Sequence, residues 1–143
     1  MDAAAFLART RPVPHSDRFA MVAVRPSERE MAMRIAASTV GFCAVLDVGH
    51  EITLLLPQER WLQVQPVFMD PAATLDFRVV TLESNVPLEQ VGYIAAVTEA
   101  LARADVPVAV LSAFSCDHLL VRDADLGRCL SVLQRAGAAA GQK

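Results

Sequence analysis

Apolar and polar residues follow one another along the chain in blocks of strand and helix length. Phe19 to Val24 is a short apolar run that predicts a buried strand. Ser27 and Glu30 have the spacing of a capping box, which marks the start of a helix. Met31 and Ile35, one turn apart, then predict the apolar face of that helix. The first block is therefore expected to begin as a strand followed by a helix.

Two further strands are expected over residues 42–47 and 51–56, and the segment between them predicts a hairpin turn. Gly49 lies in that turn and can take the positive φ that such turns require. A connector with two prolines follows at 65–73. Residues 75–83 then alternate in the manner of a strand with one buried face. The order strand, helix, strand, strand thus completes a first block, and a new strand opens the second.

The second half repeats this order. Asn85 is expected to cap a helix that carries the apolar positions from Val91 to Leu101. A central strand is expected over 106–112 and a return strand over 119–121. A last helix is expected to follow and to end at Gly137.

Two such blocks and a terminal helix predict an α+β protein built of two ferredoxin-like βαββ modules, with antiparallel sheets and helices on one face. Residues 1–17 are expected to form a loose N-terminal leader. The first module and its connector are assigned to 18–74 and the second module to 75–137. Residues 138–143 are expected to fray.

Composition narrows the classes of function. The net charge is −3, with 13 basic and 16 acidic residues and no basic run, which argues against binding of nucleic acid. The longest apolar runs are far shorter than the roughly 20 residues of a membrane span, and residues 1–11 lack the features of a secretory signal. We therefore expect a cytoplasmic protein that does not enter a membrane. The hydrophobic content of 54% is compatible with a homodimer.

The cysteines give no sign of a disulfide framework or a metal site. There are three of them, Cys43, Cys116 and Cys129, an odd number without CxxC spacing. They are expected to be small buried apolar residues in a reducing compartment. Neither a metal nor a cofactor is predicted.

Three segments resemble a known family. They are Val86-Pro-Leu-Glu-Gln-Val-Gly-Tyr93, Val108-Ala-Val-Leu-Ser-Ala-Phe-Ser-Cys-Asp-His-Leu-Leu-Val121 and Gly49-His-Glu-Ile-Thr-Leu-Leu-Leu-Pro57. Together they resemble the ACT-domain family that includes the CASTOR arginine sensors and their small bacterial relatives, with tandem ACT modules. In the second segment the matches to the family pattern are Ser112, Phe114, Asp117, Leu120 and Val121, and the departures are Ala113, Cys116 and His118.

The resemblance implies a ligand site between a strand-to-helix turn and the following strand, with the candidate residues Val91, Gly92, Tyr93, Phe114, Ser115, Cys116 and Asp117. A carboxylate can approach helix amides closely at Gly92, because glycine has no Cβ. Asp117 would face an ammonium or guanidinium group, so an amino acid suits both ends. The alternative for Gly92 is a close contact between helix and sheet, and for Asp117 it is closure of a hairpin.

The first functional hypothesis is therefore a regulatory or sensor protein that binds a small molecule, an amino acid in particular, and has no enzymatic activity. The second is an interaction protein that dimerises or regulates a partner enzyme without a ligand. The third is an enzyme built on Cys116 and His118. Because side chains alternate along a strand, Asp117 would point away from these two, so no catalytic residue is predicted.

Overall fold

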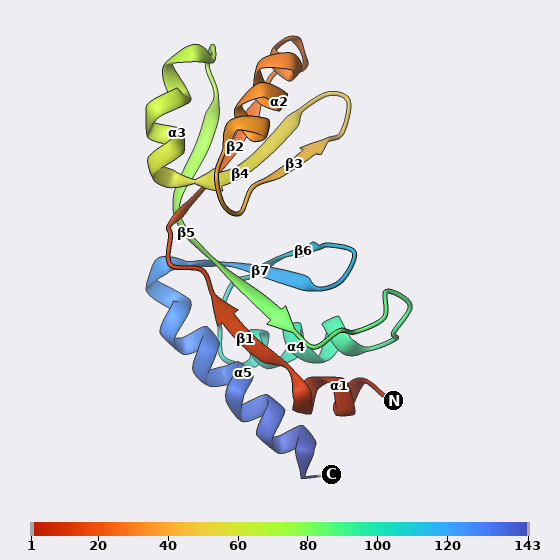
Figure 1. Ribbon diagram of the computed structural model, residues 1–143. Coiled ribbons are helices and arrows are strands. Elements are labelled where there is room, and N and C mark those ends of the chain that lie inside the picture. Colours follow the sequence, from red (N-terminus) through yellow and green to blue (C-terminus); the bar gives the residue numbers. More distant parts are fainter. Residues whose placement is uncertain (1, 143) are drawn as a thin grey trace. The chain divides into compact units, whose positions relative to one another are not determined.

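The computed structural model describes residues 2–142 and divides into two compact units. Unit 2 is the continuous segment Ser16–Phe77. Unit 1 comprises the residues up to His15 and from Arg78 onward. Figure 1 traces the chain through both units.

Unit 2 has the element order β-α-β-β-α-β. Its elements are β2 (Phe19–Val24), α2 (Arg29–Ser38), β3 (Ala44–Asp47), β4 (Ile52–Pro57), α3 (Gln58–Val64) and the first part of β5 (Ala72–Glu83), with the 3-10 turns η1 (Pro26–Glu28) and η2 (Gln65–Val67) beside the helices. The strands lie in the order β3-β4-β2-β5 and the neighbouring pairs are antiparallel. Both helices contribute to one core with the inward faces of β2 and β4, so they cover the same face of the sheet.

The helices of unit 2 differ in detail from the prediction. Because Pro26–Glu28 forms a 3-10 turn, α2 begins at Arg29 without a side-chain cap, so Ser27 does not serve as the expected capping residue. The second helix, α3, holds the buried Trp61, which stacks on Phe68 with ring centroids 5.8 Å apart. The hairpin was predicted correctly, since Gly49 has φ 91° between β3 and β4.

Unit 1 has the same strand arrangement, but one of its strands comes from the N-terminal end of the chain. Its elements are α1 (Ala3–Arg9), β1 (Arg11–Pro14), the second part of β5, α4 (Tyr93–Arg103), β6 (Ala109–Ser112), β7 (Asp117–Arg122), the 3-10 turn η3 (Asp123–Asp125) and α5 (Leu126–Gly141). The strands lie in the order β1-β5-β7-β6. β1 thus holds the position beside β5 that β5 itself holds beside β2 in unit 2. The predicted α+β class with two ferredoxin-like modules is confirmed.

The N-terminal segment is not the loose leader that the sequence suggested. Asp2 caps α1 by accepting a hydrogen bond from the Ala5 amide at 2.9 Å. Leu7 of α1 is buried in the core of unit 1. β1 pairs with β5 over its whole length and tolerates Pro12 and Pro14 because it is an edge strand. Met1, the outer end of the expected leader, lies outside the described residues.

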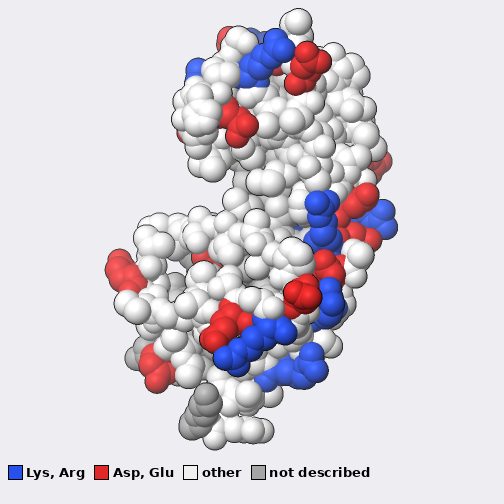
Figure 2. Space-filling view, turned by 180° about the vertical axis from the view of Figure 1, so that it is seen from behind, with Lys and Arg blue, Asp and Glu red and all other residues white. Residues whose placement is uncertain are grey.

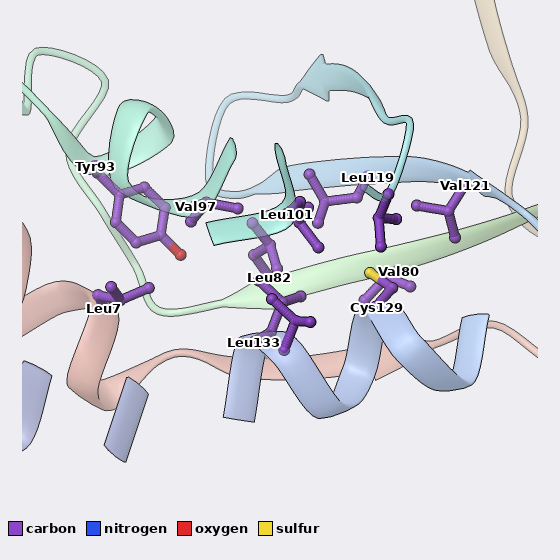
Figure 3. Packing of buried hydrophobic residues seen from close by; sticks show 12 residues of the cluster. Leu7, Val80, Leu82, Tyr93, Val97, Leu101, Leu119, Val121, Cys129 and Leu133 are labelled. Carbon is purple, nitrogen blue, oxygen red and sulfur yellow. The ribbon is translucent and has the colours of Figure 1, made fainter. Parts of the chain in front are cut away.

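The core of unit 1 lies between the sheet and three helices (Figure 3). Val80 and Leu82 of β5 point toward the helices. Leu101 of α4 and Cys129 and Leu133 of α5 pack against them. α1, α4 and α5 therefore cover one face, and the alternate residues of β5 and β7 lie on the opposite face.

Two further expectations for unit 1 need correction. β6 is shorter than predicted, because the residues from Val106 to Val108 precede the strand instead of belonging to it. It also lies at the edge of the sheet, and β7 lies between it and β5. α5 does not end at Gly137 but continues to Gly141, through part of the expected frayed tail. Lys143, the outer end of that tail, lies outside the described residues.

Gly137 allows α1 and α5 to approach closely. A Cβ at this position would lie 3.1 Å from the carbonyl oxygen of Leu7, which is tighter than ordinary contact. We expect Gly137→Ala to lower the free energy of unfolding by about 1 kcal/mol or more, because the clash outweighs the gain of up to about 1 kcal/mol in helix propensity. The control is Gly127→Ala in the same helix, where a Cβ meets nothing within 4 Å. Urea unfolding of both variants tests this: equal stabilisation by both would contradict it.

Charges of opposite sign pair across the surface of unit 1. Arg11 pairs with Glu83 across β1 and β5, and Arg103 bonds Glu99 at 2.6 Å along α4. Figure 2 shows basic and acidic residues interspersed on the face in view, rather than a continuous basic patch among the described residues. No helix in the described part of the chain is long and apolar enough to span a bilayer.

Candidate functional site

A hollow of about 90 Å³ lies in unit 1 between the start of α4 and the β6–β7 hairpin. The loop before α4 supplies one wall, and the hairpin supplies the other. The residues that line it are Val86, Pro87, Leu88, Gln90, Tyr93, Ile94, Ser112, Ala113, Phe114, Cys116 and Asp117. The two stretches that the sequence singled out are thus neighbours in space.

Four of the seven candidate residues line this hollow: Tyr93, Phe114, Cys116 and Asp117. The other three do not. Val91 is 85% exposed, and Gly92 is exposed beside it. Ser115 lines a second hollow instead.

Gly92 has a backbone role that the sequence analysis did not identify. It is the N-cap of α4 with φ 88°, a conformation that strongly favours glycine. A Cβ there would meet Ala3 at an ordinary 3.6 Å, so a close contact between helix and sheet is not the reason for glycine. No side chain caps α4. The amides of the first turn, at Tyr93 and Ile94, therefore form a positive helix end at the hollow without a side-chain acceptor.

The expected helix start at Asn85 is wrong. α4 begins at Tyr93, and Asn85 has φ 50° in a loop that leads to it. Because that loop was taken for helix, its contribution to the hollow was missed. Asn85 followed by Pro87 has the sequence pattern of a helix start, and no local signal distinguishes such a start from a loop.

Asp117 closes the hairpin and also lines the hollow. Its Oδ1 accepts a hydrogen bond from the Ser112 hydroxyl at 2.6 Å. The turn itself is Phe114-Ser115, closed by the amide of Ala113 donating to the Cys116 carbonyl at 3.0 Å. Asp117 therefore closes the hairpin and lines the hollow at the same time, because the hydrogen bond from Ser112 orients its carboxylate. Ser112 was missed as a site residue, although it belongs to the matched family segment.

Tyr93 lines the hollow, and its hydroxyl group forms hydrogen bonds inside the protein. The hydroxyl lies 2.7 Å from Thr10 Oγ1, and it accepts a hydrogen bond from Ser84 at 3.1 Å. Thr10 donates its own proton to the Phe6 carbonyl, so Tyr93 donates to Thr10. This network fixes the ring and ties the site to the N-terminal segment.

A second hollow of about 460 Å³ lies next to the first. The residues that line it are Arg9, Thr81, Glu83, Ser84, Asn85, Ser115 and Cys116. Cys116 lines both hollows.

Behind Cys116 runs a row of polar side chains. Cys116 Sγ is 3.7 Å from His118 Nε2, and His118 Nδ1 is 2.9 Å from Thr81 Oγ1. Thr81 Oγ1 is in turn 2.9 Å from His15 Nε2. Burial, and then the neighbouring His15, lowers the pKa of His118, although Asp117 acts in the opposite direction. Within residues 2–142, no cluster of three or more His, Cys, Asp or Glu side chains is arranged to hold a metal ion.

Residues 73–135 match the model of the ACT domain family. This segment is therefore similar to ACT domains. It contains every residue that lines the first hollow, and it lies mainly in unit 1. The match covers just under half of the chain.

Solved structures share the fold over nearly the whole chain. Protein VC0802 from Vibrio cholerae has a TM-score of 0.74 at 19% identity and covers 94% of each chain. Protein Atu0741 from Agobacterium tumefaciens has a TM-score of 0.70 at 19% identity and covers 90% of each chain. The regulatory subunit of aspartate kinase from Thermus thermophilus, in a ligand-free form, has a TM-score of 0.69 at 12% identity and covers 90% of this chain and 98% of its own. No curated protein matches the sequence.

Proposed function

We propose that the protein is a regulatory or sensor protein that binds a small amino acid in the hollow between α4 and the β6–β7 hairpin. One observation carries the proposal: the uncapped N-terminal end of α4 and the carboxylate of Asp117 line the same hollow. The helix end favours an anion, and Asp117 favours a cation. An amino acid carries both charges on neighbouring atoms.

The size of the hollow favours a ligand with few heavy atoms. Its volume of about 90 Å³ is well below the roughly 300–1,000 Å³ of sites for drug-sized ligands. The apolar side chains of Val86 and Ile94 complete the lining, which suits a short aliphatic side chain. The match of residues 73–135 to the ACT domain model supports a regulatory role. Unit 2 repeats the strand arrangement of unit 1. We therefore propose that unit 2 is a second ACT-like module, as the resemblance to tandem ACT proteins implies.

A thermal-shift series on the full chain tests the ligand class. One of the common amino acids is expected to raise the unfolding temperature, since a ligand at 100 times its Kd adds about 2.7 kcal/mol of stability. Two derivatives of that amino acid serve as controls. Acetylation of the amino group removes the partner of Asp117, and amidation of the carboxylate removes the partner of α4, so neither derivative should shift the temperature. Shifts with both derivatives as large as the shift with the parent amino acid would contradict the proposed site.

A second candidate function is an interaction protein that acts on a partner without a ligand. Leu88, Val91 and Phe114 are 74%, 85% and 94% exposed around the hollow. Exposed apolar residues grouped in this way are typical of interfaces. If this alternative holds, no amino acid shifts the unfolding temperature, and Phe114→Ser reduces self-association or partner binding in sedimentation experiments.

A further inference from the structure

We propose that Cys116 is a regulatory thiol that forms mixed disulfides with small disulfides, with His118 as the acceptor of its proton. The three cysteines of the chain are unpaired, and Cys116 has surroundings quite different from those of the other two. Cys129 is buried in the core, where burial raises the pKa of its thiol to about 11. Burial also raises the pKa of the Cys43 thiol. Cys116 is half-buried and borders both hollows of unit 1.

The side chains behind Cys116 can form a chain of hydrogen bonds in which each donor faces an acceptor. The thiol donates to His118 Nε2, His118 Nδ1–H donates to Thr81 Oγ1, and the Thr81 hydroxyl donates to His15 Nε2. Val80 and Leu82 face the helices, so Thr81 lies on the opposite face of the sheet, and His118 lies there for the same reason beside Leu119. A nucleophile, a base and a group that orients the base are therefore aligned across two strands.

The protonation state of His118 suits this role. Burial and His15 lower the pKa of His118, so its neutral ring offers Nε2 as an acceptor for the hydrogen bond from the thiol. When the thiol transfers its proton to Nε2, the thiolate becomes the attacking species. The new imidazolium retains two donors, one toward the sulfur and one toward Thr81.

The exchange balances without a further reactant. The thiolate of Cys116 attacks one sulfur of the small disulfide, a new S–S bond forms, and the original S–S bond breaks. The leaving thiolate takes the proton from His118 Nε2 and departs as a thiol. Cys116 borders both hollows, so the group that stays attached can extend into either one.

The modification has a consequence for the ligand site, and this consequence rests on the function proposed above. Cys116 also lines the 90 Å³ hollow beside Asp117. A group attached to its sulfur would narrow that hollow, so the modified protein is expected to bind the amino acid at least tenfold more weakly. Such coupling would make amino-acid binding sensitive to the thiol–disulfide balance.

The experiment uses the full chain with bis(2-hydroxyethyl) disulfide at pH 7 and follows each cysteine by peptide mass spectrometry. Cys116 is expected to exchange at least tenfold faster in the folded chain than in the chain unfolded in urea. Cys43 and Cys129, the internal controls, are expected to exchange more slowly when folded. A folded Cys116 that reacts no faster than an unfolded one would overturn the proposal, whatever the outcome of the amino-acid series.

Variants separate the role of His118 from mere exposure. His118→Gln is expected to slow the exchange at least tenfold at pH 7. Thr81→Val should slow the exchange and Thr81→Ser should rescue it, with circular dichroism as the check on folding. Unchanged rates in both His118→Gln and Thr81→Val would overturn the assignment of His118.

Discussion

Deletion of residues 2–15 is expected to unfold unit 1, although this segment resembles a loose leader in the sequence. The deletion removes Leu7 from the core, β1 from the edge of β5 and Thr10 from the hydroxyl of Tyr93. Loss of a buried leucine alone costs about 2–5 kcal/mol, and domains of this size are stable by only about 5–15 kcal/mol. Tyr93 is the only tyrosine and lies in unit 1, whereas Trp61 is the only tryptophan and lies in unit 2. Their side-chain NMR signals therefore report on the two units separately.

A point substitution gives the milder form of the same test. Leu7→Ala is expected to lower the free energy of unfolding by about 2–5 kcal/mol. Leu88→Ala makes the same chemical change at a side chain that is 74% exposed and should cost no more than about 0.5 kcal/mol. If the deleted chain keeps a native Tyr93 signal, or if the two leucine variants are equally stable, the N-terminal segment is not part of the core.

Asp117→Asn is expected to weaken amino-acid binding at least tenfold while the fold stays intact. The amide oxygen of asparagine can still accept the hydrogen bond from Ser112, so the hairpin is retained. What is lost is the negative charge, and hydrogen bonds to charged groups contribute about 1.5–3 kcal/mol. Isothermal titration calorimetry of the wild type and the variant measures the loss directly.

Glu89→Gln is the matched control for this substitution. Glu89 lies in the exposed loop before α4 but does not line the hollow. Its substitution removes the same charge from the same region, so it measures the effect of net charge alone. The ligand model would be wrong if both variants bound the amino acid as tightly as the wild type does.

Much of the fold follows from local patterns in the sequence. The strand from Phe19 to Val24 and the turn at Gly49 have the predicted bounds and geometry, because strand alternation and a glycine turn are local signals. β1 could not be found in this way. Arg11 pairs with Glu83, far away along the chain, and two prolines in four residues do not indicate a strand.

The residues of the candidate site could likewise be predicted only in part from the sequence. Tyr93 and Asp117 were selected through the family resemblance, and both line the hollow. Ser112 and the loop before α4 were missed, since the helix was placed too early. Gly92 was chosen for its lack of a Cβ, but its positive φ is the feature that requires glycine, and φ cannot be read from a single residue type.

The most direct measurement of the proposed function is an NMR titration of the 15N-labelled full chain with the amino acid that gives the largest thermal shift. If the ligand carboxylate binds at the start of α4 and its ammonium group binds at Asp117, the amide signals of Tyr93, Ile94 and Asp117 should move together and saturate at one Kd. Saturable shifts confined to residues away from this hollow, or no shifts with any amino acid, would contradict the account.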